Sequence, residues 1–332
     1  MNKILTIIIP TYNMEKYLRR CLDSLIIDEE GMKQLEVLVI NDGSKDSSSQ
    51  IAHEYQDKYP DTYRVIDKEN GNYGSCINRG LKEATAKYVK VLDADDWFDT
   101  KNLNLYVDTL REVDADLVVT NCVIVNEKGE RTGCFDSKEF ENNKEYSFSE
   151  IAYRRFFPQM HCVTYRLEML KGMKYVQTEG ISYTDQEWVT KPFASIVRIY
   201  YVDIYLYFYL VGRDGQTVSK TITNKSFDHH RRVALSLLDF AESYKGDEEH
   251  KNYLLSKAFD YTKILYRAHI LELSFNDKDF RTFDDFLKKH YHYLYVLLSK
   301  NTFKNYICWW RLDKLNLFSI IIKISTKFRQ WH

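Results

Sequence analysis

Short apolar runs that end in polar turns dominate the first hundred residues. Residues 5–9, 37–40 and 88–92 are mostly apolar and show no alternation, which is typical of parallel strands buried on both faces of a sheet. Between them, residues 14–25 and the stretch through Leu81 and Ala84 carry apolar positions at helical spacing. This alternation predicts an α/β fold with a mostly parallel central sheet flanked by helices.

The pattern changes after about residue 225. All four prolines lie at or before Pro192, and Gly246 is the last glycine. From residue 226 onward apolar residues recur with helical periodicity, which predicts about four helices. We therefore expect an α/β domain over residues 1–222 and a helical C-terminal region over residues 223–332.

The last thirty residues, 303–332, interleave aromatic and aliphatic side chains with lysines and arginines, and Asp313 is their only acid. Their apolar stretches are shorter than the roughly 20 residues needed to span a bilayer. A basic, aromatic helix fits peripheral contact with anionic lipid. Packing against the rest of the chain, or against a second subunit in a homo-oligomer, explains the same pattern, and the sequence leaves these alternatives open.

The composition limits the expected partners and the expected cellular location. The chain has 332 residues and a formal net charge of −1, so we expect no nucleic-acid partner. Its six cysteines show no metal-binding spacing, which favours free thiols in a reducing compartment. An apolar strand begins almost at once, so the sequence predicts no signal peptide and a cytoplasmic location.

Three carboxylates, Asp93, Asp95 and Asp96, follow the third apolar run within four residues. Carboxylates gathered at a strand end repel one another unless a cation lies among them, and hard divalent cations prefer oxygen ligands. This DxD pattern therefore predicts a site for Mn²⁺ or Mg²⁺ and a phosphorylated ligand. An acidic turn that caps the next helix is the structural alternative.

Three other polar turns support a ligand site. Residues 10–13 (PTYN) follow the first run, and residues 41–46 (NDGSKD) follow the second. Residues 69–81 contain two closely spaced glycines, Gly71 and Gly74, before a helix, a pattern that suits close approach of a phosphate. Taken singly, each is equally well explained as an ordinary turn or helix cap. In an open α/β sheet, however, such turns meet where ligands bind.

The order of these four motifs resembles that of the inverting glycosyltransferases of family two, which have the GT-A fold and use nucleotide-sugar donors. The resemblance is close over residues 3–100, thinner over 101–220 and absent beyond. It implies that Pro10, Thr11 and Tyr12 line a base pocket and that Asp42 hydrogen-bonds the base, most often uracil. The donor loop would be shaped by Asn70, Gly71, Gly74 and Asn78.

The resemblance also assigns the acidic motif. Asp95 would hold the metal that bridges the diphosphate, Asp93 would face the ribose or sugar, and Asp96 would contact the sugar or support the metal shell. The chain departs from the usual family pattern at Asn41, where an Asp is frequent, and at residues 72–73 of the donor loop. Arg79 follows Asn78, whereas many relatives place an arginine just before that asparagine.

Inverting transfer needs a carboxylate that accepts the proton of the attacking hydroxyl. In relatives a Glu-Asp pair opens a helix downstream, and Thr184-Asp185 occupies that place here, which makes Asp185 the expected base and Glu187 its competitor. A helix cap explains the same residues. Further on, Arg213 lies between two glycines in a loop that, by resemblance, closes over the donor and reaches the diphosphate. A surface hairpin turn is the alternative.

These features together predict a glycosyltransferase that uses a UDP-sugar and a divalent metal to extend a lipid-linked or protein-linked glycan, in capsule, exopolysaccharide or teichoic-type synthesis. The resemblance places such an enzyme peripherally on the inner face of the plasma membrane. The competing hypothesis is a non-catalytic binding partner for glycans or nucleotides that retains the fold. The set Asp42, Asp93, Asp95 and Asp185 argues against it, because a scaffold needs none of them.

Overall fold

The computed structural model describes residues 3–213, 216, 224–272, 276–300 and 306–313. It divides into two compact units, Met1–Gln216 with Gly246–Tyr253, and Thr217–Lys245 with Leu254–His332. The expected boundary at residue 222 and most of the segment 303–332 lie outside the described residues.

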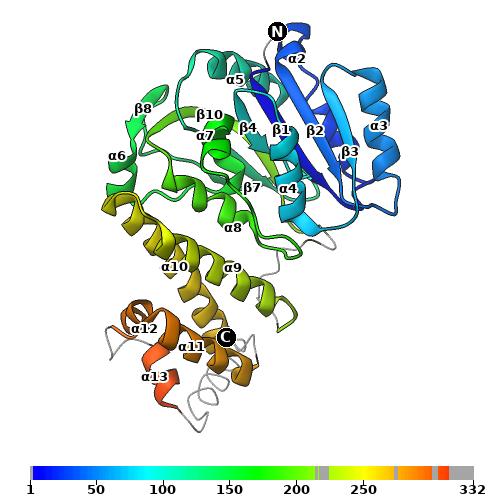
Figure 1. Cartoon of the computed structure of the whole chain (residues 1–332). Helices are drawn as coiled ribbons and strands as arrows, with labels where there is room; N and C mark the ends of the chain where they lie inside the picture. Colours follow the sequence, from blue (N-terminus) through cyan, green and yellow to red (C-terminus); the bar gives the residue numbers. More distant parts are fainter. Residues whose placement is uncertain (1–2, 214–215, 217–223, 273–275, 301–305, 314–332) are drawn as a thin grey trace. The chain divides into compact units, whose positions relative to one another are not determined.

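The first unit is built on a ten-stranded sheet in the order β3-β2-β1-β4-β9-β6-β10-β5, with β7 beside β6 and β8 beside β10 (Figure 1). The strands β1 to β4 pair in parallel, and β6 pairs in parallel with β10. Their bounds are β1 Leu5–Thr11, β2 Leu35–Asn41, β3 Tyr63–Asp67, β4 Tyr88–Val91, β5 Trp97–Phe98, β6 Leu117–Val125, β7 Arg131–Phe135, β8 Lys144–Ser147, β9 Val163–Arg166 and β10 Arg198–Leu210. This mixed α/β sheet confirms the predicted fold class.

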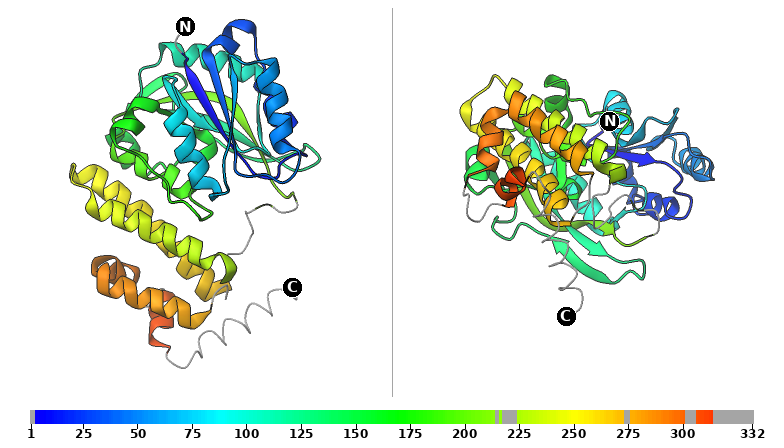
Figure 2. Two further views of the ribbon diagram at one scale, coloured as in Figure 1. Left: turned by 45° about the vertical axis from the view of Figure 1, so that its right-hand side comes forward. Right: turned by 90° about the horizontal axis from the view of Figure 1, so that it is seen from below.

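Helices flank the sheet, and α4 packs on β1 and β2, as Figure 2 also shows. The packing is close because Gly80 of α4 lies directly over Ile8, whose Cγ2 would be 2.6 Å from an added Cβ. The helices of this unit are α1 Leu18–Asp23, α2 Glu29–Gln34, α3 Ser48–Lys58, α4 Asn72–Glu83, α5 Thr100–Glu112, α6 Phe148–Tyr153, α7 Leu167–Gly172 and α8 Asp185–Trp188, with short 3₁₀ turns at Met160–Cys162 and Lys191–Ala194.

Two helical elements differ from their predicted extents. The apolar stripe over residues 14–25 forms a helix only over α1, because the segment before it is a turn whose backbone Met14 and Glu15 N–H groups bond to Ser48 and Asp46. The helix α4 begins at Asn72, inside the expected glycine loop. Asn72 has a positive φ of 65°, so the chain turns sharply there into the helix.

The second unit is helical. Its described helices are α9 Asn224–Ser243, α10 Glu248–Glu272, α11 Asp277–His290, α12 His292–Leu298 and α13 Tyr306–Leu312, one more than the sequence predicted, and the first residues of α10 belong to the first unit. An ion pair between Asp284 and Arg311 ties α11 to α13, and Arg311 also stacks 3.5 Å from the ring of Tyr295 in α12. Within the described residues, none of the helices is long and apolar enough to cross a bilayer.

Candidate functional site

The predicted polar turns meet at one edge of the sheet. Parallel pairing sets Thr11 opposite Asn41 at the ends of β1 and β2, and β4 ends beside β1 just before the three carboxylates. Asn13 joins the first two turns, since its backbone N–H donates to Ser44 Oγ and its side chain accepts from the Lys45 N–H at 2.8 Å. The carboxyl ends of the strands therefore form one continuous polar rim.

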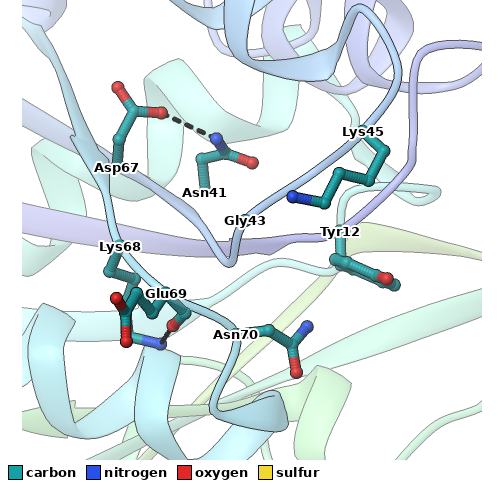
Figure 3. A pocket seen from close by; sticks show the side chains of 8 residues that line it. All are labelled: Tyr12, Asn41, Gly43, Lys45, Asp67, Lys68, Glu69 and Asn70. Atoms are coloured by element: carbon teal, nitrogen blue, oxygen red, sulfur yellow. Dashed lines mark hydrogen bonds between the residues drawn. The ribbon is translucent and has the colours of Figure 1, made fainter.

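A pocket of about 600 Å³ opens on this rim (Figure 3). Tyr12 lies at its edge with 46 % of its surface exposed, far more than a packed tyrosine would leave free. The other lining residues are Asn41, Gly43, Lys45, Asp67, Lys68, Glu69 and Asn70. A flat exposed ring beside amides, carboxylates and lysines offers both stacking and hydrogen bonding to a planar heterocycle.

Asp42 organises the loop below the pocket. Its buried carboxylate pairs with the Lys68 ammonium and accepts the backbone N–H groups of Gly71 and Asn72, both at 2.9 Å. The Asn70 amide donates in turn to the Asp42 carbonyl at 3.0 Å. The carboxylate thus holds the first N–H groups of α4, groups that would otherwise be open to a phosphate. A contact between Asp42 and a base remains a prediction.

One glycine of the predicted donor loop, Gly74, packs closely against another segment of the protein. A Cβ on Gly74 would lie 2.1 Å from the carbonyl oxygen of Thr178, so no side chain fits there. Asn78 fastens the same contact, because its amide donates to the Gln177 carbonyl and to Glu179 and accepts the Gln177 N–H. These residues join α4 to residues 177–180, which lead into α8.

The three carboxylates after β4 have different partners. Asp93 accepts a hydrogen bond from the Tyr73 hydroxyl at 2.9 Å. Asp96 is fully buried and accepts from the Tyr207 hydroxyl at 2.7 Å and from the Leu210 N–H at 2.8 Å. Asp95 forms an ion pair with the guanidinium of Arg213. The structure therefore ties the expected metal ligand to the expected lid residue.

The electrostatics of this cluster favour a cation. Burial, reinforced by the nearby charge of Asp95, raises the pKa of both Asp93 and Asp96. Ligand atoms of Asp93, Asp96 and His161 lie within 4.8 Å of one another, and the buried His161 Nδ1 has no hydrogen-bond partner in the described structure. With the Asp95 carboxylate beside them, these oxygen and nitrogen donors match the ligands that divalent metals take in proteins.

Asp185 opens α8 and is close enough to Asp93 for their charges to interact. Its carboxylate accepts a hydrogen bond from the Gln186 side chain at 3.0 Å. Burial raises the pKa of Asp185 to about 6, because the charged form loses hydration. A carboxylate with this pKa is ionised at neutral pH yet more basic than an exposed aspartate, as proton abstraction requires.

Glu187 occupies a different environment. It is fully buried, and its oxygens accept from the Thr178 N–H at 2.7 Å, the Thr178 hydroxyl at 2.8 Å and the Lys191 ammonium at 2.9 Å. These hydrogen bonds and the ion pair with Lys191 fix residues 177–180 against α8. The geometry favours a structural role for Glu187, and Asp185 stays the predicted base.

We predict that Glu187→Gln lowers stability by about 3 kcal/mol, because it removes the charge of one partner from the buried ion pair between Glu187 and Lys191. Thermal unfolding of the purified protein measures this. Glu179→Gln, at an exposed glutamate on the same loop, serves as the control and should change the unfolding midpoint far less. An unchanged midpoint for Glu187→Gln would contradict the structural role.

Several site residues were not among the sequence predictions. Arg20 donates to the Asp95 carbonyl at 2.9 Å and stacks on Trp97 at 3.7 Å, which orients the acidic turn. The rings of Tyr207 and Tyr209 flank that of His161, at 4.9 and 4.2 Å. The alternation of tyrosines along β10 was a usable signal, since residues 207 and 209 must share a face of the strand.

Comparison with known proteins agrees with this architecture. The family model described as glycosyl transferase family 2 matches residues 6–173. The chain is 27 % identical over 255 residues to the poly(ribitol-phosphate) beta-N-acetylglucosaminyltransferase TarS of Staphylococcus aureus, covering 76 % of this chain and 43 % of TarS. It is 27 % identical over 248 residues to the minor teichoic acid biosynthesis protein GgaB of Bacillus subtilis, covering 72 % and 27 %.

Solved structures share the fold. A crystal structure of Staphylococcus aureus TarS residues 1–349 in complex with UDP-GlcNAc superimposes with a TM-score of 0.67 at 22 % identity, over 86 % of this chain and 80 % of that one. A mannosyltransferase from Pyrobaculum calidifontis in complex with GDP-Man and Mn²⁺ has a TM-score of 0.54 at 15 % identity, over 98 % and 87 %.

The chain spans less than half the length of these two curated relatives, so the likeness concerns one part of each. Within this chain, the matched segment covers just over half of the residues and includes all four polar turns of the rim. The similarity to TarS covers 76 % of the chain, so it extends beyond residue 220, where no resemblance was expected. The family resemblance inferred from the motifs is confirmed, and the chain belongs to glycosyl transferase family 2.

Proposed function

We propose that this chain transfers a sugar from a nucleotide-diphosphate sugar to a glycan hydroxyl with inversion at the anomeric carbon. The observation that carries the proposal is the arrangement on the rim. A pocket edged by Tyr12 and a carboxylate cluster lie on the same rim, and Asp185 stands within electrostatic range of the cluster. A binding partner without activity would not need a partly exposed carboxylate with a raised pKa at this point.

The donor is proposed to be a UDP-sugar. TarS residues 1–349 have been crystallised with UDP-GlcNAc and with UDP. The alignment with TarS covers 76 % of this chain. In the proposed complex Tyr12 stacks on the base, with Pro10 and Thr11 beside it, and Asn70 and Asn78 shape the loop near the diphosphate. The metal would be Mn²⁺ or Mg²⁺, held by Asp95 with Asp93 nearby.

The chemistry follows from the residues on the rim. Asp185 takes the proton of the acceptor hydroxyl. At the same time the oxygen of that hydroxyl forms a bond to the anomeric carbon, and the bond from this carbon to the diphosphate breaks. A bound divalent metal would neutralise charge on the leaving diphosphate. Arg213 adds a second positive charge there once it leaves Asp95, and the buried Asp96 fixes the end of β10 below the site.

The acceptor is proposed to be a lipid-linked or protein-linked glycan of the cell surface. The names of TarS and GgaB connect those two relatives to teichoic acids. Such an acceptor would be met at the inner face of the plasma membrane, which is also where we propose that the C-terminal region makes peripheral contact.

Activity is expected to fall as pH decreases below about 6. Asp185 must be ionised to accept a proton, and its raised pKa of about 6 sets the limit. Below it, kcat/KM should drop about tenfold for each unit of pH. A profile measured with metal held saturating tests this; full activity at pH 5 would exclude Asp185 as the base.

The proposal is tested by thermal shift of the full chain against a panel of nucleotide sugars with Mn²⁺, Mg²⁺ or EDTA. A ligand that binds only the native state raises the unfolding temperature by mass action. A shift with one UDP-sugar that disappears in EDTA supports the donor and the metal together. Absence of any shift with every nucleotide sugar would contradict the proposed donor site and favour a binding partner for glycans alone.

A further inference from the structure

The near-neutral charge of the whole chain conceals two oppositely charged units. The helical second unit contains 19 Lys and Arg against 10 Asp and Glu, a formal net charge of +9. This leaves 28 of the 47 basic residues and 38 of the 48 acidic residues for the first unit, a net charge of −10. Charge of one sign on one compact unit produces a field that attracts partners of the opposite sign.

Basic residues collect where α11 meets α12. Lys288, Lys289 and His290 end α11 and His292 begins α12, and all four are exposed. Two nearby acids are held in internal pairs, whereas a third, Asp285, is exposed beside the lysines. Asp284 accepts from Arg311 at 2.6 and 2.9 Å, and a second acid, Asp277, accepts from Arg281 and from the Trp310 indole.

Exposed apolar side chains adjoin this basic end. On α12, Tyr293 and Val296 are 69 % and 43 % exposed, and on α13 Trp309 and Leu312 are 49 % and 71 % exposed. Each pair is spaced three residues apart, so its members share a helix face. The helices α12 and α13 are neighbours, because Arg311 donates to the Tyr295 carbonyl at 2.9 Å.

We infer that this surface, formed by Lys288, Lys289, Tyr293, Val296, Trp309 and Leu312, docks the chain on an anionic lipid bilayer. A lipid bilayer can bind both the basic and the exposed apolar side chains of this surface. Lysines are attracted to anionic headgroups, while tryptophan and aliphatic side chains enter the boundary between headgroups and acyl chains. A soluble polyanion would use the lysines but would leave the apolar residues in water. This surface belongs to folded helices and precedes the segment 314–332.

This surface would bring the enzyme of the proposed function to its acceptor, and its role rests on that function. Vesicle binding is measured without donor or acceptor, so loss of the docking surface and loss of the transferase activity can be told apart. The full chain is sedimented with vesicles of neutral phosphatidylcholine and with vesicles that also contain anionic phosphatidylglycerol. We expect binding to the anionic vesicles, weakened by salt because the attraction is screened.

Two double variants separate the contributions. Lys288→Gln with Lys289→Gln should weaken partitioning onto anionic vesicles by about tenfold or more, since each basic residue near the surface contributes substantially. Trp309→Ser with Leu312→Ser should also weaken it and should leave the lysine-dependent part sensitive to salt. Lys58→Gln with Lys82→Gln, at exposed lysines of the first unit, is the matched control and should bind like the parent chain. Thermal unfolding and circular dichroism confirm that each variant is folded.

Three results would overturn the inference. The first is equal binding of the parent chain to neutral and anionic vesicles, or binding to neither. The second is binding to soluble polyphosphate that depends on Lys288 and Lys289 while Trp309→Ser with Leu312→Ser leaves vesicle binding unchanged, which would identify a polyanion surface. The third is a parent chain that dimerises in solution through Trp309 and Leu312, which would make the apolar face a contact between copies.

Discussion

Asp185→Asn is expected to reduce turnover by a factor of about 10² to 10⁴, the range that a positioned general base contributes. The amide keeps the size and the hydrogen-bonding geometry of the carboxylate at the start of α8, but it cannot accept the acceptor's proton. The affinity for UDP in the presence of metal should stay within about twofold of the parent, because Asp185 faces the acceptor side of the cluster in the proposed complex. Single-turnover kinetics and nucleotide titration measure the two effects separately.

The Glu187→Gln variant is the comparison that tests whether Asp185 or Glu187 is the base. Its carboxylate is surrounded by Thr178 and Lys191, so its loss should appear first as lower stability and only then as lower activity. A Glu187→Gln enzyme that is fully folded but inactive, beside an active Asp185→Asn enzyme, would reverse the assignment. If both variants transfer sugar normally, the base lies elsewhere on the rim.

The strands and the polar turns at their ends could be predicted from the sequence because their signals are local. The apolar runs before Pro10, Asn41 and Asp93 each fix a buried strand, and parallel pairing then brings their carboxyl ends to one edge. The pocket edged by Tyr12 follows from that geometry. Helix starts were less predictable, since the first N–H groups of α4 are accepted by the distant Asp42.

Contacts that depend on tertiary structure were beyond the sequence. Gly74 looked like a site of phosphate approach, yet the nearest neighbour of an added Cβ there is the Thr178 backbone. The role of Glu187 depends on Thr178 and Lys191, and only the folded loop shows that it is fully buried among their donors. The charge asymmetry was hidden for a similar reason, because a whole-chain sum cancels charges that the fold places in separate units.

The pairing of Asp95 with Arg213 gives the second large expected effect. Both side chains are largely buried, and the guanidinium supplies a positive charge to the carboxylate that we propose as the metal ligand. If Asp95 holds the metal as proposed, metal and Arg213 compete for it. In the proposed donor complex the metal takes Asp95 and Arg213 turns to the diphosphate, so a single exchange would couple metal binding to the arrival of nucleotide.

Substitution of Asp95 and substitution of Arg213 should have opposite effects on metal binding. Asp95→Asn should abolish the metal-dependent part of UDP affinity, so that titrations with Mn²⁺ and with EDTA coincide. Arg213→Gln should instead tighten Mn²⁺ binding in the absence of nucleotide by about tenfold, because a charge-assisted hydrogen bond of about 1.5–3 kcal/mol no longer has to be broken. The same variant should weaken UDP binding in the presence of Mn²⁺, since the diphosphate loses a cation.

Electron paramagnetic resonance measures Mn²⁺ binding, and titration measures UDP binding. The two measurements together distinguish an exchange of Asp95 between Arg213 and the metal from a simple loss of charge. Arg198→Gln is the matched control, because Arg198 lies at the other end of β10 and pairs with the exposed Asp114. It removes the same charge at a distance from the acidic cluster and should leave both affinities unchanged. If Arg213→Gln weakens Mn²⁺ binding without nucleotide, Arg213 supports the metal site and does not compete for it. If Asp95→Asn still binds UDP more tightly with Mn²⁺ than with EDTA, the metal belongs to Asp93, Asp96 and His161 instead.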